Sequence, residues 1–176
     1  YKPAWYLYGM ARSLCEDMQE LPLPSGIEVR PARKEDLWTI WRAAREAFRD
    51  GREYSEERWS RKAFEGRNRS GTFDPTLWQI AWEGDEVVGG VHNYIDKEEN
   101  DSFERLWGHT EQIFVRRPWR GRGIAKGLIS RSFRLLRQRG METAVLDVDS
   151  ENPSGAPGMY EGLGYKPYAK FIFYRK

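Results

Sequence analysis

The spacing of apolar residues along the chain shifts between two periods, and each shift marks the border of a predicted element. From residue 34 to residue 49 apolar side chains recur every three or four positions, which indicates a helix with one buried face. Ser55 fits the N-cap of a second helix ending near Phe64, since acidic residues follow it in the first turn. We expect two further helices, over 124–139 and from about residue 154 to residue 163.

Segments of alternating or continuous apolar residues predict the strands of one sheet. The order strand, two helices, three strands, helix, strand, helix, strand is typical of an α/β (α+β) fold. We therefore predict a mixed, mostly antiparallel central sheet with helices on both faces. The predicted strands cover 27–31, 77–83, 87–96, 106–115, 142–149 and 165–174, and a charged turn is expected at 97–101.

Composition narrows the class of protein. The 176 residues suit one domain, and an aromatic content of 14% argues against disorder. No apolar run approaches the roughly 20 residues of a membrane span, and the first residues lack the charge and apolar stretch of a signal peptide. We therefore expect a cytoplasmic protein without a membrane partner.

Cysteine and charge exclude further classes. Cys15 is the only cysteine, so no disulfide can form within this chain and no cysteine-based metal site is available. We expect no metal. A net charge of +2 does not by itself indicate nucleic acid, because nucleic-acid binders usually carry a basic stripe across a whole face.

The two ends of the chain echo each other. Tyr1-Lys2-Pro3 opens an aromatic, strand-like run, and Tyr165-Lys166-Pro167 opens a second one near the C-terminus. One interpretation is that residues 1–18 hold the last strand of a preceding copy of the same domain and the start of a linker. Residues 19–26, rich in proline and glycine, are then the linker, and 27–176 the domain. The alternative is a chance tripeptide beside two aromatic strands.

The segment from Val115 to Ala125 carries the most specific chemistry, and it lies between a predicted strand and a predicted helix. Gly121 and Gly123 allow a tight turn that presents successive amide N–H groups, and the helix start adds partial positive charge. This arrangement is typical of a pyrophosphate site, whereas the alternative is a solvated turn with incidental arginines. Fixed cations come from Arg116, Arg117, Arg120 and Arg122.

Two nucleotide motifs do not fit this segment. The Gly-Lys-Ser/Thr ending of a P-loop is absent, and the glycines do not have the dinucleotide spacing Gly-x-Gly-x-x-Gly. Instead, Arg120-Gly121-Arg122-Gly123-Ile124-Ala125 matches the Arg/Gln-x-x-Gly-x-Gly/Ala signature of the GNAT acyltransferases. The segments Asn152-Pro153-Ser154-Gly155-Ala156, Met159-Tyr160 and Leu163-Gly164-Tyr165 resemble the closing motif of that family.

The resemblance covers about residues 27–176, by motif in the last 75 and by element order before that. The Asn-Pro-Ser-Gly-Ala form and the echo of the two ends also resemble mycothiol-synthase-like tandem members. Pro157 departs from the pattern of most members, although proline is tolerated in the first turn of a helix.

The resemblance implies an N-acetyltransferase that uses acetyl-CoA, or a related acyl-CoA, to acylate a small-molecule or peptide amine. The site would open where the strands 106–115 and 142–149 splay, with unpaired backbone groups for the pantetheine arm. Ile113, Phe114 and Val115 would pair with this arm, and Asn152 would hydrogen-bond it. The pyrophosphate would lie on the amides of Arg120, Gly121, Arg122, Gly123, Ile124 and Ala125.

Acyl transfer to an amine needs a base for the amine and an acid for the departing thiolate. Tyr160 occupies the family position of the acid, and packing in the core is its alternative role. Glu111 and His109 share one face of their strand and are the candidates for the base. Glu111 is favoured only because family members often carry a carboxylate there, and Asp147 and Asp149 are weaker candidates.

Three function classes stay open from the sequence. Besides the enzyme, the chain fits an acyl-CoA-binding, non-catalytic half of a tandem protein, since Tyr160 and Glu111 matter only to catalysis. Nucleic-acid binding through the arginines of 116–122 is a third reading, but no aromatic stacking platform flanks them. A preceding GNAT-like domain and a second copy of the chain are the protein partners we consider. The resemblance places acceptor specificity in the first two helices and the loop from Arg49 to Tyr54.

Overall fold

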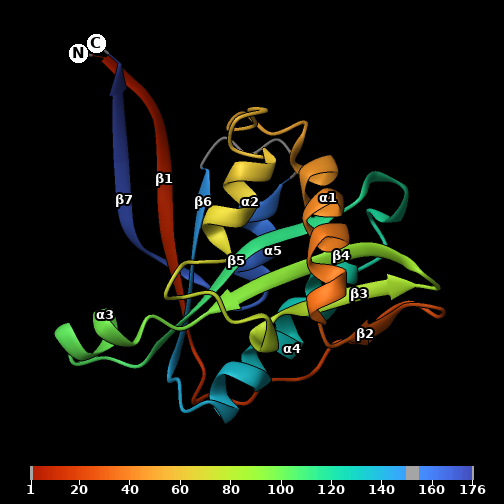
Figure 1. The fold of residues 1–176 in the computed structure, drawn as a ribbon. Coiled ribbons are helices and arrows are strands. Elements are labelled where there is room, and N and C mark those ends of the chain that lie inside the picture. Colours follow the sequence, from red (N-terminus) through yellow and green to blue (C-terminus); the bar gives the residue numbers. More distant parts are fainter. Residues whose placement is uncertain (1, 150–154, 176) are drawn as a thin grey trace.

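The computed structural model describes residues 2–149 and 155–175, which form a seven-stranded sheet with helices against both faces (Figure 1). The strand order is β2-β3-β4-β5-β6-β1-β7, and only the β5–β6 pair is parallel. The predicted mixed, mostly antiparallel sheet is confirmed. The strands are β1 (Lys2–Ser13), β2 (Glu28–Arg30), β3 (Gln79–Glu83), β4 (Glu86–Tyr94), β5 (Trp107–Val115), β6 (Thr143–Asp149) and β7 (Lys166–Arg175). The α-helices are α1 (Leu37–Phe48), α2 (Arg61–Arg67), α3 (Lys97–Ser102), α4 (Ile124–Gln138) and α5 (Ala156–Gly162).

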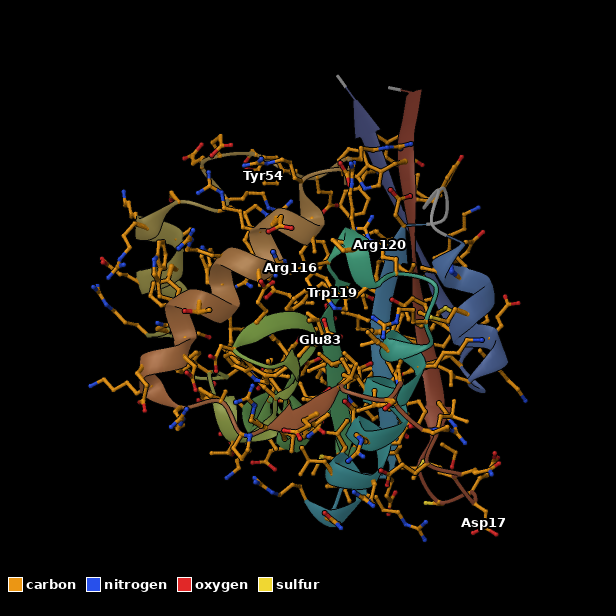
Figure 2. All side chains as sticks on the ribbon, turned by 90° about the vertical axis from the view of Figure 1, so that its right-hand side faces the viewer. Asp17, Tyr54, Glu83, Arg116, Trp119 and Arg120 are labelled. Carbon is orange, nitrogen blue, oxygen red and sulfur yellow. The ribbon has the colours of Figure 1, made fainter. Side chains whose placement is uncertain are left out.

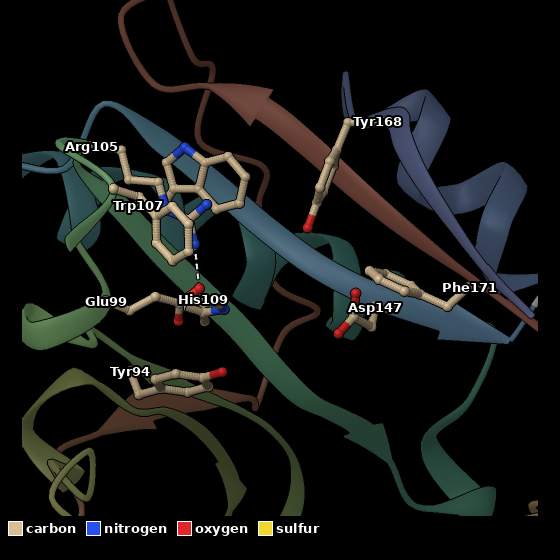
Figure 3. Close-up of a pocket in the computed structure, with 9 residues that line it drawn as sticks. Tyr94, Glu99, Arg105, Trp107, His109, Asp147, Tyr168 and Phe171 are labelled. Carbon is tan, nitrogen blue, oxygen red and sulfur yellow. Dashed lines mark hydrogen bonds and ion pairs between the residues drawn. The ribbon is translucent and has the colours of Figure 1, made fainter.

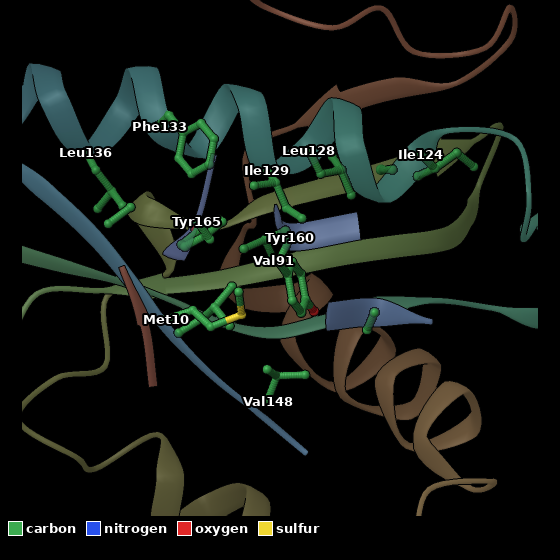
Figure 4. Packing of buried hydrophobic residues seen from close by; sticks show 14 of the residues in the cluster. Met10, Val91, Ile124, Leu128, Ile129, Phe133, Leu136, Val148, Tyr160 and Tyr165 are labelled. Atoms are coloured by element: carbon green, nitrogen blue, oxygen red, sulfur yellow. The ribbon is translucent and has the colours of Figure 1, made fainter. Parts of the chain in front are cut away.

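Each face of the sheet has its own hydrophobic core. Helices α4 and α5 cover one face, where Leu128, Phe133 and Tyr165 are almost fully buried (Figure 4). Helices α1 and α2 cover the other face over β3, β4 and β5, with Trp41 and Trp59 packed against each other. Helix α1 packs on β4 and β5.

Strand β1 lies inside the sheet, between β6 and β7 and antiparallel to both (Figure 1). Met10 pairs with Leu146 of β6 and with Pro167 of β7, and its side chain is 1% exposed. The two segments that echo each other in sequence are therefore neighbours in space. The predicted domain start at residue 27 leaves out a strand that this sheet contains. The assignment of β1 to a preceding copy of the domain stays a prediction.

The predicted linker runs along α4. The Leu21 amide donates to Ser130 Oγ at 3.0 Å, and Leu23 lies so close that a Cβ at Gly127 would meet its Cδ2 at 2.7 Å. Glu20 forms ion pairs with Arg131 and Arg134 on the same helix. These contacts hold the chain between β1 and β2 against the α4 face.

Two helical predictions need correction. The second helix begins at Arg61 and ends at Arg67, not over 55–64, because Ser60 is its N-cap and accepts from the Ala63 amide at 3.2 Å. Ser55 instead closes a turn by accepting from the Arg58 amide. Residues 97–102 form the short helix α3 in place of a turn, since Asp96 caps it by accepting from the Glu99 amide at 2.9 Å. In the described part of the chain, no helix is long and apolar enough to cross a membrane.

Candidate active site

The parallel strands β5 and β6 pair over only three positions and then separate. The last pair is His109 with Val145, whereas β5 continues to Val115 and β6 to Asp149. The predicted splay between these strands is thus present. Thr110 bridges its start, because Thr110 Oγ1 donates to the Val145 carbonyl at 3.2 Å and lies 2.7 Å from the Tyr165 hydroxyl. Beyond this point the facing backbone edges no longer form a ladder.

The predicted glycine loop leads directly from the end of β5 to the start of α4. Gly121 and Gly123 have φ angles of +74° and +81°, in the left-handed region that favours glycine. Among the described residues, the amides from Gly121 to Lys126 donate no hydrogen bond to the protein. These free donors at the start of a 15-residue helix form an arrangement suited to a phosphate group. The Arg120 amide, however, donates to the Arg117 carbonyl at 3.2 Å, so the row of free amides begins at Gly121.

The loop arginines are less free than the sequence suggests. Arg120 donates from Nε to the Val115 carbonyl and from Nη2 to the Ala47 carbonyl, both at 2.9 Å, and so ties the loop to the end of α1 (Figure 2). Arg122 lies 3.9 Å from Glu83 and is half-exposed. Of the four cations, Arg122 has the longest and loosest ion pair.

Arg116 and Arg117 hold acidic partners outside the loop. Arg116 binds Glu46 and Glu86, which raises the pKa of its guanidinium despite partial burial. Arg117 binds Asp50, and this hydrogen bond holds the pKa of that carboxyl below its ordinary value. Both arginines therefore fasten β5 and the loop to α1 and its C-terminal end.

The strand residues proposed for pantetheine divide between the two cores. Ile113 and Val115 pack against the α4 core, whereas Phe114 is buried in the α1 core. Their backbone edge toward β6 lies in the splay, as the pantetheine hypothesis requires. Asn152 lies outside the described residues.

Tyr160 on α5 lies in the α4 core, 7% exposed, with its ring edge-on to Tyr165 at 6.0 Å (Figure 4). Burial and the nearby Glu111 raise the pKa of its phenol, so the hydroxyl keeps its proton at neutral pH. Among the described residues, this hydroxyl makes no hydrogen bond. It is a proton donor without a partner among residues 2–149 and 155–175.

Glu111 lies two residues beyond the last β5–β6 pair, and Asp147 occupies the equivalent position on β6. Burial, with the Asp147 charge as a smaller cause, raises the pKa of Glu111 to about 8, against the opposing effects of the Arg67 charge and of the Asp147 backbone. Asp147 itself has its pKa raised by burial. The two residues therefore lie at equivalent positions of neighbouring strands, at the mouth of the splay.

A pocket of about 410 Å³ opens beside Asp147 (Figure 3). His109 lies in it, stacked on Tyr94 at 4.3 Å and 4.0 Å from Glu99, and burial lowers the pKa of its imidazole. His109 is therefore neutral at neutral pH. The pocket is lined by Tyr94, Glu99, Phe103, Arg105, Trp107, His109, Asp147, Tyr168 and Phe171.

The sequence of this chain is similar to those of known acetyltransferases. The family model described as the acetyltransferase (GNAT) family matches residues 34–165. The chain belongs to the GNAT acetyltransferase family. Mycothiol acetyltransferase of Streptomyces scabiei is 32% identical to it over 170 residues, which are 94% of this chain and 52% of that protein. The chain spans about half the length of the curated relatives it matches.

Solved structures of N-acetyltransferases are similar to this chain. A GCN5-related N-acetyltransferase from Sphaerobacter thermophilus is 30% identical, with a TM-score of 0.74 over 98% of this chain and 51% of that one. The PaiA N-acetyltransferase of Thermoplasma acidophilum, solved in complex with coenzyme A, shares the fold at 20% identity, with a TM-score of 0.58 over 77% of this chain and 87% of that one.

Several features of this GNAT acetyltransferase site gave no signal in the sequence. Gln112 has a φ of +44° and lies at a bulge where the β4–β5 register shifts. The residue types at this position do not predict a bulge. Arg67, from the last turn of α2, is exposed, and its guanidinium lies 5.2 Å from the centre of the Trp41 ring. Its charge opposes the rise in the pKa of Glu111. Because the sequence pattern predicts a second helix that ends near Phe64, it does not single out Arg67. Among the described residues no group of three or more histidine, cysteine or acidic side chains could hold a metal ion.

Proposed function

We propose that this chain is an acetyl-CoA-dependent N-acetyltransferase that acylates a small amine. The observation that carries the proposal is the combination of splayed strands with a row of free amides at the start of α4. The free amides of Gly121 to Lys126 suit the pyrophosphate, with Arg122 as a side-chain cation. The unpaired edges of β5 and β6 suit the amide groups of the pantetheine arm. Acetyl-CoA supplies the activated thioester when bound.

Glu111 is our candidate for the general base. A base works best when its pKa lies near the operating pH, and burial brings Glu111 into that range. Glu111 takes a proton from the acceptor ammonium, which leaves a neutral amine as the nucleophile. His109 is neutral and shares the same face of β5, so it is the alternative base.

Tyr160 is our candidate for the general acid. Its phenol is protonated at neutral pH because burial raises its pKa, and no described side chain occupies its hydroxyl. A thiolate has an ordinary pKa of roughly 8.5, so a nearby phenol can return a proton to it as the carbon–sulfur bond breaks. The products are then an amide and free coenzyme A.

The relatives named mycothiol acetyltransferase suggest the kind of acceptor: a small metabolite and not a protein side chain. They also support a tandem organisation, because this chain matches about half of each. Within such a protein the chain is either the catalytic half or an acyl-CoA-binding half without turnover. The Glu111 and Tyr160 geometry favours the catalytic half, because binding alone needs neither group.

Calorimetric titration with acetyl-CoA, using ATP and NAD as controls at two salt concentrations, tests the cofactor directly. We expect acetyl-CoA alone to bind, with modest salt dependence. A thiol-release assay with a panel of amines then separates catalysis from binding. The kcat/KM for the amine should rise with pH as Glu111 loses its proton. Failure of a folded sample to bind acetyl-CoA would contradict the proposal, whereas binding without thiol release would favour the non-catalytic half.

A further inference from the structure

Asp147 connects the splay to the pocket beside it. Its side chain lines the pocket, and it lies at the mouth of the splay opposite Glu111, two residues beyond the last β5–β6 pair. Figure 3 shows Asp147 entering from β6 on the side opposite Tyr94 and His109. A ligand in the pocket that touches Asp147 therefore also reaches the mouth of the splay.

The Asp147 carboxylate has no partner among the described residues. Glu99, the other carboxylate in the pocket, already binds Arg105, whose guanidinium also lies 3.6 Å from the Trp107 ring centre. In the described part of the chain, the exposed Asp147 makes no side-chain hydrogen bond or ion pair of this kind, and desolvation still raises the pKa of its carboxyl. An unpaired, partly desolvated carboxylate attracts a cation that can also donate a hydrogen bond.

The walls around Asp147 are aromatic. Trp107 and Tyr168 meet edge to face at 5.3 Å, and Tyr94 closes the far side against His109. Tyr168 lies directly over Gly9 of β1, where a Cβ would meet its ring at 2.8 Å. Aromatic faces around a carboxylate favour a cationic ligand with a flat or cyclic body. A volume of about 410 Å³ is of the size that small molecules occupy.

We propose that this pocket binds the acceptor, a small primary amine with a flat or cyclic body, and that Asp147 binds its ammonium group. The inference rests on the proposed function and names its acceptor class. On this inference the acceptor is recognised by the surface formed by β5, β6 and β7, and not by the loop between α1 and α2. Asp147 holds one N–H of the amine while Glu111, at the equivalent position on β5, takes another proton.

Titration with benzylamine and its neutral isostere benzyl alcohol, followed through the Trp107 indole N–H resonance by NMR, tests the pocket without turnover. For ligands this small we expect a Kd for benzylamine on the order of 1–10 mM and a preference of roughly tenfold or more over the alcohol. Asp147→Asn should reduce this preference to about twofold or less. Asp85→Asn, at an exposed site in the β3–β4 turn, should leave it unchanged.

A second pair of variants tests the walls. Tyr168→Ala should weaken benzylamine and benzyl alcohol by similar factors, whereas Tyr174→Ala, on the same strand and also exposed, should affect neither. An Asp147→Asn variant that keeps the amine preference, or no shift of Trp107 with either probe, would overturn the proposal. A separate acetyl-CoA titration keeps the two hypotheses apart. Acetyl-CoA binding without amine binding defeats only the pocket, and the reverse result defeats only the transferase.

Discussion

Burial sets the protonation states of the residues that matter most to this site. Glu111 keeps a proton to unusually high pH, Tyr160 keeps its phenolic proton, and His109 stays neutral. In each case desolvation is the largest cause, because the charged form loses hydration. The residue that must accept a proton therefore titrates near neutral pH, and the residue that must donate one is protonated.

The raised pKa of Glu111 predicts a pH-dependent stability. Between its ordinary pKa of 4.5 and the folded value of about 8, the folded state holds a proton that the unfolded state has lost, so this group lowers stability as pH rises. Glu111→Gln should therefore resemble the wild type near pH 4 and exceed it by roughly 1–3 kcal/mol near pH 9. Urea unfolding at both pH values measures the difference. Glu57→Gln, at an exposed site, is the control. If the unfolding free energies of Glu111→Gln and the wild type change equally with pH, the raised pKa of Glu111 is contradicted.

Replacement of Tyr160 by phenylalanine separates chemistry from packing. Tyr160→Phe keeps the ring in the core but removes the proton donor, so we expect kcat to fall by about 100-fold with the Kd of acetyl-CoA unchanged. Tyr165→Phe is the matched control, because its hydroxyl bonds Thr110 and has a structural role. That variant should lose about 1 kcal/mol of stability and little activity. Stopped-flow and steady-state assays compare the two, and an unchanged kcat for Tyr160→Phe would assign Tyr160 to the core alone.

At the scale of elements, local patterns predicted most of the fold, and tertiary contacts account for the misses. The strand, glycine loop and helix from Trp107 to Gln138 follow the predicted order, because period and glycine positions are local signals. The placement of α2 failed because both Ser55 and Ser60 can cap, and the burial of Phe64 against Trp38 and Trp41 favours the later start. The bulge at Gln112 depends on its pairing with β4, which a single strand does not reveal.

The glycine loop offers an element-scale test with its own internal control. Gly123 and Gly140 lie at opposite ends of α4, with similar φ angles of +81° and +85° and open space where a side chain would stand. Tryptophan at either position should cost a similar amount of stability, about 1 kcal/mol or more. Only Gly123→Trp should abolish acetyl-CoA binding in calorimetry, because only that side chain would cover the free amides. Equal affinities in two folded variants would remove the loop from the cofactor site.

At the scale of the whole molecule, the position of β1 decides how the sheet holds together. β7 pairs with β1, and β1 pairs with β6, so within the described residues β1 is the strand that joins β7 to the rest of the sheet. Its Met10 and the following Leu14 are almost fully buried against the α4 core. The sequence suggested that this strand belongs to a preceding copy of the domain, but the sequence alone contains no signal for the sheet that the strand completes.

Removal of residues 1–18 tests this dependence. The shortened chain 19–176 should lose cooperative unfolding, because β7 and the side chain of Tyr165 lose their neighbours in the sheet and Met10 leaves a cavity. A synthetic peptide of residues 1–18, added in excess, should restore the cooperative transition, and its effect on Tm should grow with peptide concentration as for any ligand of the folded state. A peptide with Met10→Asp should fail to restore it, since a charge would enter a buried position. If the shortened chain instead unfolds cooperatively at the wild-type Tm without peptide, β1 is dispensable to this sheet. The strand's place between β6 and β7 would then serve a neighbouring domain and not this one.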